Sequence, residues 1–592
     1  MNSDLPPLPD TIMAPRTDAV YNCHAYLTKV PVAAIRPFIE AFTAPGETVV
    51  DFFAGSGMTG IAAAIVGRRA FLSDISVLGQ HIATGYLTDV PEGAFRKAAA
   101  YVMQEARTAL GGFYVTKRAA DGASVEMVRT VWSFTYRCPG CHAELVYYEH
   151  LQGSGIDQCP TCKGPFAKRN WPTGDDVPVQ VVVHGINGLL TEQNVAVTDR
   201  AAIAAAGADP RQADIPSFPI DASREMFSRS GLGKRGLTET AKFFSSRNAI
   251  ALLELWRAIA AVTDEKVSKK LSFAFTAILP RASRRYQWSA QRPLNAQNQT
   301  YYIAPVYYEW NIFELFERKI EAAIRADAEV FASSSLFERK TPGDTSYVIA
   351  SADQLHHIAA ASVDYVFTDP PFGSNIFYSD MNLFHEAWLG TMTDHAREAV
   401  MHTTGKKRSG AAARYEVLLR RAFSEAFRIL RPGRYMSVVF GNSDGRIWSL
   451  VQRAIHGAGF EAVPVHVAIL DKGQRSVKGL NSGSENVVTV DLIMTIQKPL
   501  FDSANARASE PVPADARALI AQAIADMPHD RTRNPSHVYA AVLRDAIRRQ
   551  QTVDHLHLGD VLVALRNAGY GIDPKTGLLV GSNAPDIAAA AE

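Results

Sequence analysis

Hydrophobic positions along the chain change their spacing several times, and these changes predict its secondary structure. Residues 32–42 (VAAIRPFIEAF) carry apolar side chains at helical spacing, and Pro45-Gly46 then marks a turn. A β-branched run at Thr48–Val50 precedes a glycine loop, an Ala-rich helical stretch and an apolar run that ends at Asp74. The order strand, tight turn, helix and strand predicts a βαβ unit and therefore a parallel sheet.

The same alternation of strands and helices returns in the second half of the chain. A helix is predicted near Tyr415–Leu430, and strands are predicted at Tyr347–Ile349, Val363–Thr368, Tyr435–Phe440 and Val487–Ile496. Two segments of different texture lie between these α/β parts. Residues 112–185 hold short β-like runs around four cysteines, and residues 200–345 carry helical patterns.

Composition describes an ordinary globular protein long enough for several cores. The 592 residues are 47% hydrophobic and 20% charged, and 61 Lys+Arg against 60 Asp+Glu give a net charge of +1. A nucleic-acid partner must therefore be argued from local patches rather than from overall charge. Neither a long uncharged apolar run nor a basic start followed by an apolar stretch occurs, so we expect a cytoplasmic protein without membrane association.

The glycine loop is the first candidate for chemistry. Gly55, Gly57 and Gly60 satisfy G-x-G-x-x-G between a predicted strand and a predicted helix. Such glycines permit a tight turn and let backbone N–H groups approach a nucleotide-like ligand. Asp74 follows Gly57 at about the distance of an acid that binds ribose hydroxyls. The motif alone does not separate a dinucleotide from S-adenosylmethionine, because both present a ribose.

A second candidate loop follows the strand predicted at Val363–Thr368. It reads Asp369-Pro370-Pro371-Phe372 and lies at the carboxyl end of that strand, where α/β sheets place their ligands. Two prolines make the loop stiff. A stiff loop suits a carboxylate and a proline carbonyl that accept hydrogen bonds from one exocyclic amino group, while an aromatic side chain stacks on a flipped base.

Two cysteine pairs form the most specific local motif. Cys138-Pro-Gly-Cys141 and Cys159-Pro-Thr-Cys162 stand 17 residues apart, which is the spacing of a tetrahedral Cys₄ zinc site. A closed site of this kind holds a structural Zn²⁺ and performs no chemistry.

These motifs together resemble a known family. VVDFFAGSGMTG resembles the cofactor motif, and DPPF the catalytic motif, of DNA methyltransferases that methylate amino groups with S-adenosylmethionine. Lys29-Val30-Pro31 resembles the segment that precedes this cofactor motif. With its cysteine pairs, the chain most resembles the adenine-specific DNA methylases that contain a zinc ribbon. One departure is Phe372, which stands where tyrosine is commoner.

The resemblance implies a site, a reaction and a division of the chain. S-adenosylmethionine would donate a methyl group to an exocyclic amine of a flipped base in double-stranded DNA, with adenine N6 favoured. The implied catalytic residues are Asp369, Pro370, Pro371 and Phe372. The implied cofactor residues are Lys29, Pro31, Asp51, Phe53, Gly55, Ser56, Gly57, Thr59 and Asp74, with Asp353 as a second acid for the ribose.

The expected fold is a doubly wound, Rossmann-like methyltransferase sheet with an inserted zinc ribbon and a helical insert. Its predicted parts are a flexible N-terminus (1–20), a first methyltransferase part (21–111), the zinc ribbon (112–185), a mostly helical target-recognition insert (186–345), a second methyltransferase part (346–500) and a helical C-terminal region (501–592).

Basic and aromatic residues supply two candidate DNA contacts. The first is an Arg-rich, aromatic stretch free of acidic residues, and its alternative interpretation is a loop that packs its aromatics on the catalytic domain. The second follows the catalytic loop, where a charge run is also typical of a solvated face. The predicted residues are Arg281, Arg284, Arg285, Tyr286 and Trp288 in the first, and Lys406, Lys407 and Arg408 in the second.

Other functions stay open from the sequence. A cytosine-N4 DNA methyltransferase or an RNA amino-methyltransferase would share the catalytic loop. A nicotinamide-dependent oxidoreductase would share the glycine loop but leave DPPF and the cysteines unexplained. A DNA-binding protein without turnover is a further alternative. Partner proteins of a restriction or defence system are compatible with the sequence but not indicated by it.

Overall fold

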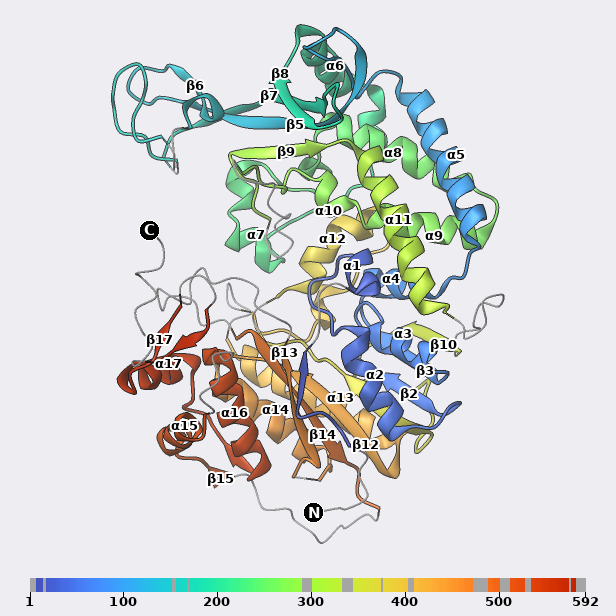
Figure 1. Cartoon of the computed structure of the whole chain (residues 1–592), viewed down its shortest axis with the longest axis vertical. Coiled ribbons are helices and arrows are strands. Elements are labelled where there is room, and N and C mark those ends of the chain that lie inside the picture. The colour runs from blue at the N-terminus through green and yellow to red at the C-terminus, as the bar shows by residue number, and fades with distance from the viewer. Residues whose placement is uncertain are drawn as a thin grey trace.

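The computed structural model describes residues 7–13, 18–151, 156–168, 170–289, 301–332, 344–373, 376–402, 409–461, 463–471, 488–500, 512–527, 534–573 and 577–581. Two large sheets lie at opposite ends of the molecule, and helices fill the space between them (Figure 1).

The main sheet has eight strands in the order β1-β13-β14-β12-β11-β2-β3-β10. All neighbouring pairs are parallel except those made by β14, which runs antiparallel to both β12 and β13. The strands are β1 (Thr11–Met13), β2 (Thr48–Asp51), β3 (Arg69–Asp74), β10 (Thr345–Ile349), β11 (Val363–Thr368), β12 (Leu430–Phe440), β13 (His466–Asp471) and β14 (Val490–Gln497).

Helices cover both faces of this sheet because its central strands are apolar on both sides. Along β11, Tyr365 and Phe367 pack with α2 and α3, whereas Val366 between them packs with α13, α14 and α16. This alternation follows the two-residue period of a strand. The helices are α2 (Val32–Phe42), α3 (Met58–Ile65), α13 (Ala411–Ile429), α14 (Gly445–Gly457) and α16 (Pro535–Arg548). The doubly wound α/β fold predicted from the sequence is confirmed.

The connections place a crevice between β2 and β11. From β2 the chain proceeds to β3 on one side, and from β11 to β12 on the other. Such a reversal of strand order is where open α/β sheets bind ligands, outside the carboxyl ends of the strands. The glycine loop follows β2 and Asp369 follows β11, so both candidate loops lie at this point.

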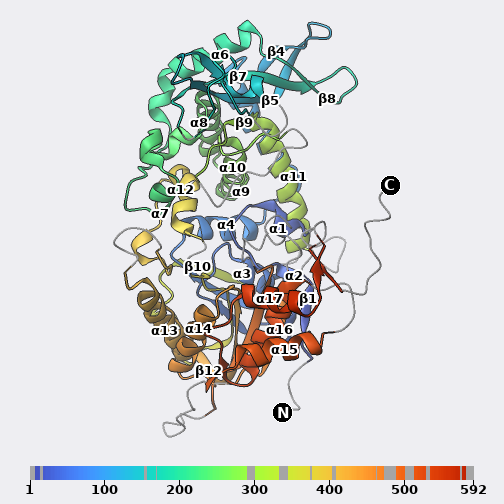
Figure 2. The same cartoon turned by 90° about the vertical axis from the view of Figure 1, so that its left-hand side faces the viewer.

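The second sheet has six strands and stands at the other end of the molecule (Figure 2). Its long strand β5 pairs with four others. The strands are β4 (Val115–Lys117), β5 (Ser124–Arg137), β6 (Glu144–Val146), β7 (Thr173–His184), β8 (Leu190–Asn194) and β9 (Val306–Trp310). Helices α5 (Glu92–Leu110), α8 (Ser246–Ala260), α9 (Glu265–Thr276) and α11 (Ile312–Val330) pack between the two sheets.

Shorter elements complete the described chain. The remaining helices are α1 (Ala19–Cys23), α4 (Val77–Leu87), α6 (Val197–Ala208), α7 (Glu225–Arg229), α10 (Leu279–Ala282), α12 (Tyr378–Leu389), α15 (Ala516–Ala525) and α17 (Leu558–Asn567). Two small strand pairs join β15 (Val512–Pro513) to β16 (Gln551–Thr552) and β17 (Gly571–Ile572) to β18 (Leu579–Val580). Within the described ranges, no helix has the length and hydropathy needed to cross a bilayer.

The structure corrects two parts of the predicted division. Residues 11–13, assigned to a flexible N-terminus, form β1 and pair with β13 because Ile12 is buried there. The predicted boundary at residue 185 runs through the second sheet, since β8 and β9 of the segment predicted to be mostly helical pair with β7 and β5. The C-terminal helix α16 packs on β13 and β14 and so completes one face of the main sheet.

Candidate functional site

A cavity opens at the carboxyl ends of β2, β3 and β11. Its empty space is about 1010 Å³, counting the part open to solvent at its mouth. It brings together residues that the sequence analysis assigned to separate roles. The predicted residues that line it are Lys29, Asp51, Phe53, Gly55, Ser56, Thr59, Asp74 and Asp353 for the cofactor, and Asp369 and Pro371 for catalysis.

The glycine loop is shaped by close approach to its neighbours. Gly57 has φ +78° and begins α3, and a Cβ there would lie 2.5 Å from the Cβ of Ala83. Gly79 on α4 leaves so little room that a Cβ would lie 2.2 Å from the Gly55 carbonyl oxygen. That same oxygen accepts a 2.9 Å hydrogen bond from the Tyr347 hydroxyl. Glycine at these positions is therefore a packing requirement. Gly57 itself supports the loop from behind and does not line the cavity.

Asp51 connects the glycine loop to the catalytic loop. Its carboxylate accepts hydrogen bonds from the Phe53 N–H (3.1 Å), the Thr59 hydroxyl (2.7 Å) and the Thr368 hydroxyl (2.8 Å). Thr368 directly precedes Asp369, so one buried carboxylate fixes both loops. Burial raises the pKa of Asp51 to about 7 even though its three donors favour the charged form.

The side chains of Asp74 and Lys29 both line the cavity, but their polar ends bind different parts of the backbone. The Asp74 carboxylate accepts from the Gly55 N–H and the Ser76 N–H, both at 2.9 Å, and burial raises its pKa. The Lys29 ammonium group instead donates to the backbone carbonyls of Tyr21 and His24. Burial lowers the pKa of Lys29 to about 7. The aliphatic part of the Lys29 side chain therefore lines the cavity, while its amino group binds the segment that leads into α2.

Pro31 plays a related part outside the cavity. Its carbonyl accepts from the N–H groups of Ala34 and Ile35 and starts α2. The predicted cofactor residue Pro31 thus lies beside the cavity lining rather than in it.

The DPPF loop is held through its carbonyl groups. The Pro371 carbonyl accepts from the Tyr415 hydroxyl, the Phe372 carbonyl from the Asn442 side-chain amide (2.9 Å) and the Gly373 carbonyl from the Met401 N–H (3.2 Å). These three bonds come from α13, the end of β12 and the segment after α12. Within the part of the chain that the structure describes, no donor occupies the Pro370 carbonyl.

Phe372 lies elsewhere than the predicted stacking role requires. Its ring packs edge-on against Phe440, with 5.1 Å between centroids, and belongs to the core under α13 and α14. It does not line the cavity in this conformation. Tyr378 lines the cavity together with Asp369; its ring stacks on Tyr26 at 6.1 Å, and its hydroxyl forms a 2.7 Å hydrogen bond with that of Thr28.

The sequence analysis missed several lining residues. They come from the segment before α2, from the N-cap of α4 and from α12 with the segment that follows it, and they include Tyr26, Thr28, Ser76, Tyr378, Asn382, Thr393 and Glu398. Glu398 accepts from the N–H groups of Tyr378 (2.6 Å) and Ser379 (3.2 Å), and burial raises its pKa to about 7. The spacing of Tyr378 and Asn382, four positions apart on one helix face, was a usable signal.

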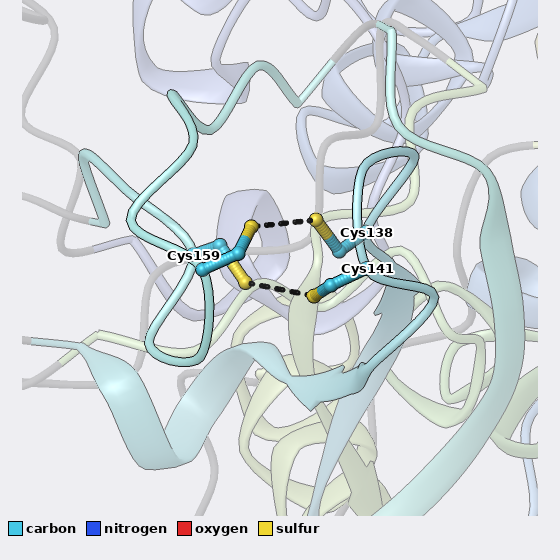
Figure 3. Close-up of side chains that lie close together, drawn as sticks. Cys138, Cys141 and Cys159 are labelled. Atoms are coloured by element: carbon cyan, nitrogen blue, oxygen red, sulfur yellow. Dashed lines mark hydrogen bonds between the residues drawn. The ribbon is translucent and has the colours of Figure 1, made fainter.

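The four cysteines form two matching turns at the end of the β5–β7 arm. In each turn the fifth residue donates its N–H to the first cysteine's carbonyl, as His142 does to Cys138 (2.9 Å) and Lys163 to Cys159 (3.0 Å). His142 and Lys163 both have positive φ, at 58° and 64°. Figure 3 shows Cys138 and Cys141 on one loop facing Cys159 on the other.

The sulfur positions fit a tetrahedral zinc ion. The Sγ atoms of Cys138 and Cys162 lie 3.6 Å apart, and those of Cys141 and Cys159 lie 3.7 Å apart. All four lie within 4.8 Å of one another. A regular tetrahedron with Zn–S bonds of about 2.3 Å has sulfur–sulfur edges of about 3.8 Å, which agrees with these spacings.

The first basic and aromatic stretch is built into the protein interior. Arg285 is 2% exposed and Tyr286 is 3% exposed, so neither reaches a DNA phosphate or base in this conformation. Arg284 pairs with Asp176, and Trp288 packs edge-on against Tyr148 at 5.3 Å. This corrects the predicted DNA contacts for Arg285 and Tyr286 and favours the alternative interpretation, in which the stretch packs on the rest of the protein.

The other predicted DNA contacts stay predictions. Arg281 is half-buried on α10, with its guanidinium 5.8 Å from the centre of the Tyr286 ring. Lys406, Lys407 and Arg408 fall outside the described residues.

Two segments of the chain match known protein families. Residues 12–85, which carry the glycine loop, match a family described as DNA methylase. Residues 137–170, which carry the four cysteines, match a family described as transcription factor zinc-finger. The chain is 52% identical over 42 residues to YubD of Escherichia coli (strain K12), provisionally named a methylase. That match spans 7% of this chain and 18% of YubD.

Two solved structures align with part of the chain. A SAM-dependent methyltransferase from Methanosarcina mazei aligns with 30% of this chain and 78% of its own, at 13% identity and a TM-score of 0.17. A protein of Thermus thermophilus, provisionally named a DNA modification methylase, aligns with 32% of this chain and 71% of its own, at 16% identity and a TM-score of 0.16. Similarity this low carries no conclusion about activity.

Proposed function

We propose that this protein is a DNA methyltransferase that transfers a methyl group from S-adenosylmethionine to the exocyclic amine of a flipped base, with adenine N6 as the target. The observation that carries the proposal is that the glycine loop, Asp74 and Asp369 line one cavity. The family match over residues 12–85 supports the same class of reaction. Cytosine N4 is the alternative target, because the same catalytic loop serves both amines.

The cofactor would lie between the glycine loop and the segment that follows β10, which contributes Ser351, Ala352 and Asp353 to the cavity. When bound, S-adenosylmethionine supplies a methyl group already activated by its sulfonium, so the protein has mainly to position the reactants and exclude water. Gly55 and Ser56 present the loop to the cavity, and Asp74 stands where an acid after the second strand accepts from ribose hydroxyls. Asp353 lines the same cavity and is the competing acid.

The target amine would lie at the catalytic loop. An exocyclic amine is a poor nucleophile because its lone pair is delocalised into the ring. Hydrogen bonds from the amine to the Asp369 carboxylate and the Pro370 carbonyl would favour its pyramidal form. The ties to Pro371, Phe372 and Gly373 leave the Pro370 carbonyl for this purpose.

Zinc would stabilise the arm formed by β5, β6 and β7. Cys138, Cys141, Cys159 and Cys162 would complete a closed coordination sphere, so the metal would fold the arm and take no part in methyl transfer.

The test is an alanine substitution that separates binding from turnover. Asp369→Ala should abolish methyl transfer and leave S-adenosylmethionine affinity within a few-fold, because the carboxylate acts on the amine. Asp394→Ala is the matched control, since Asp394 is exposed and only caps a short turn through the Ala396 N–H. Near-normal turnover of Asp369→Ala would show that the assigned chemistry is wrong.

A further inference from the structure

A second, smaller cavity lies behind the first, between α4, α10 and α12. Its empty space is about 320 Å³, counting the part open to solvent, and it shares the side chains of Tyr26 and Asn382 with the main cavity. Besides Asn382, two polar side chains that line it are almost wholly buried: Arg285 is 2% exposed and His385 is 6% exposed. The proposed methyl transfer uses neither of them.

Arg285 carries a buried charge that no carboxylate of the described residues neutralises. Its guanidinium lies 4.0 Å from the centre of the Phe384 ring, and its Nε is 3.4 Å from the Ser283 hydroxyl. Its Nη1 has no hydrogen-bond acceptor. Among the described residues, no carboxylate forms an ion pair with it, and burial lowers the pKa of Arg285 to about 10. An isolated buried cation is unfavourable, and natural proteins normally pair such a group.

His385 adds an unused donor to the same cavity. Among the described residues, neither of its ring nitrogens makes a hydrogen bond of good geometry, and the backbone acceptor near the ring is the Asn382 carbonyl. Its neighbour His24, 6.1 Å away between ring centroids, is fully engaged by the Ala25 carbonyl (2.9 Å) and the Thr276 hydroxyl (3.0 Å). Burial and the Arg285 charge lower the pKa of His385 to about 3, so the ring is neutral and offers one N–H donor.

We propose that this second cavity binds an oxyanion, a phosphate or carboxylate group, through the Arg285 guanidinium and an N–H of His385. A water molecule would satisfy the polar atoms but would not neutralise the charge, whereas an oxyanion does both. Because Tyr26 and Asn382 separate this cavity from the cofactor cavity, the anion has two sources: free phosphate, or the carboxylate of a ligand in the main cavity. The proposal does not depend on the methyltransferase assignment.

The test uses the full-length, zinc-loaded protein and inorganic phosphate. Phosphate should raise the unfolding temperature at constant ionic strength, and calorimetry should show saturable binding against a chloride background. Arg285→Met should abolish both effects without lowering the unfolding temperature measured free of phosphate. Arg281→Met removes the same charge from a half-buried side chain on α10, and this variant should retain both effects of phosphate. Should Arg285→Met fail to fold, His385→Leu should still weaken phosphate binding several-fold.

Competition identifies the source of the anion. Displacement of phosphate by S-adenosylmethionine but not by 5′-methylthioadenosine, which lacks the carboxylate, assigns the site to that carboxylate. Retention of phosphate in the presence of S-adenosylmethionine assigns the site to free phosphate. The proposal is overturned if the wild-type protein binds no phosphate, or if Arg285→Met lowers the unfolding temperature and leaves the phosphate effect unchanged.

Discussion

Gly79→Ala should weaken cofactor binding by moving the glycine loop. Gly79 lies on α4 behind the loop, and its new Cβ would stand 2.2 Å from the Gly55 carbonyl oxygen and 2.6 Å from the Tyr347 hydroxyl. Reaching an ordinary contact requires a displacement of about 1 Å. Neither neighbour is free to yield, because the Tyr347 hydroxyl itself donates to the Gly55 carbonyl.

The magnitude follows from two opposing terms. Overpacking of this kind costs about 1–3 kcal/mol, and replacing glycine by alanine within a helix returns up to about 1 kcal/mol. The net destabilisation is then about 0–3 kcal/mol. Gly93→Ala on α5 is the matched control, because a Cβ there meets nothing within 4 Å. It should stabilise the protein by about 0.4–1 kcal/mol.

Calorimetry of S-adenosylmethionine binding separates the two variants. If displacement of the loop reduces the free energy of cofactor binding by about 1.4 kcal/mol, Gly79→Ala binds S-adenosylmethionine about tenfold more weakly. Gly93→Ala should bind it as the wild type does. Equal affinity of the two variants would refute the argument that the loop's position, set from behind by α4, determines cofactor binding.

Three further predictions address the acid, the metal and the titration of the site. Asp74→Ala should weaken S-adenosylmethionine binding by about 1.5–3 kcal/mol in calorimetry, whereas Asp353→Ala should not. Elemental analysis should find one zinc per chain, lost in Cys138→Ser and kept in Cys23→Ser. Because the pKa of Asp51 is raised to about 7, its stabilising contribution is full below about pH 4 and is lost as pH rises through 7. The unfolding temperature of the wild type relative to Asp51→Asn should therefore fall between pH 5 and pH 8.

For each of these three predictions, a specific result would contradict it. If Asp353→Ala alone weakens binding, the ribose site belongs to Asp353. If protein prepared without chelator carries no zinc, the metal assignment is wrong. If cofactor affinity disappears together with zinc, the arm supports the catalytic half directly. A difference between wild type and Asp51→Asn that is constant with pH would show that Asp51 stays charged in the folded protein.

Local patterns in the sequence predicted the elements that carry the site. The run at Thr48–Val50 and the glycines after it are strand β2 and the turn into α3, and Asp369 follows strand β11 as expected. The spacing of the cysteine pairs anticipated the clustering of their sulfur atoms. In these cases the hydrophobic period, the turn residues and the spacing of the ligands are local properties of a short stretch of chain. They can therefore be read from a single sequence.

Other features depend on contacts between distant segments. The three-residue strand β1 exists because it pairs with β13, more than 450 positions later, and no periodicity is visible in three residues. Arg284 lies in a stretch without acidic residues, yet its partner Asp176 comes from β7, 108 positions earlier. The absence of acidic residues nearby in the sequence therefore suggested free guanidinium groups. In the folded chain, however, a distant segment supplies a carboxylate to Arg284.

The most direct test of the central claim is methyl transfer followed by identification of the methylated base. Protein would be incubated with tritiated S-adenosylmethionine and either unmethylated plasmid or total RNA, and the labelled product digested to nucleosides. We expect label in plasmid DNA as N6-methyldeoxyadenosine, with none in RNA. Label in N4-methyldeoxycytidine would change the target base, whereas label in RNA alone, or in neither substrate, would contradict the proposed function.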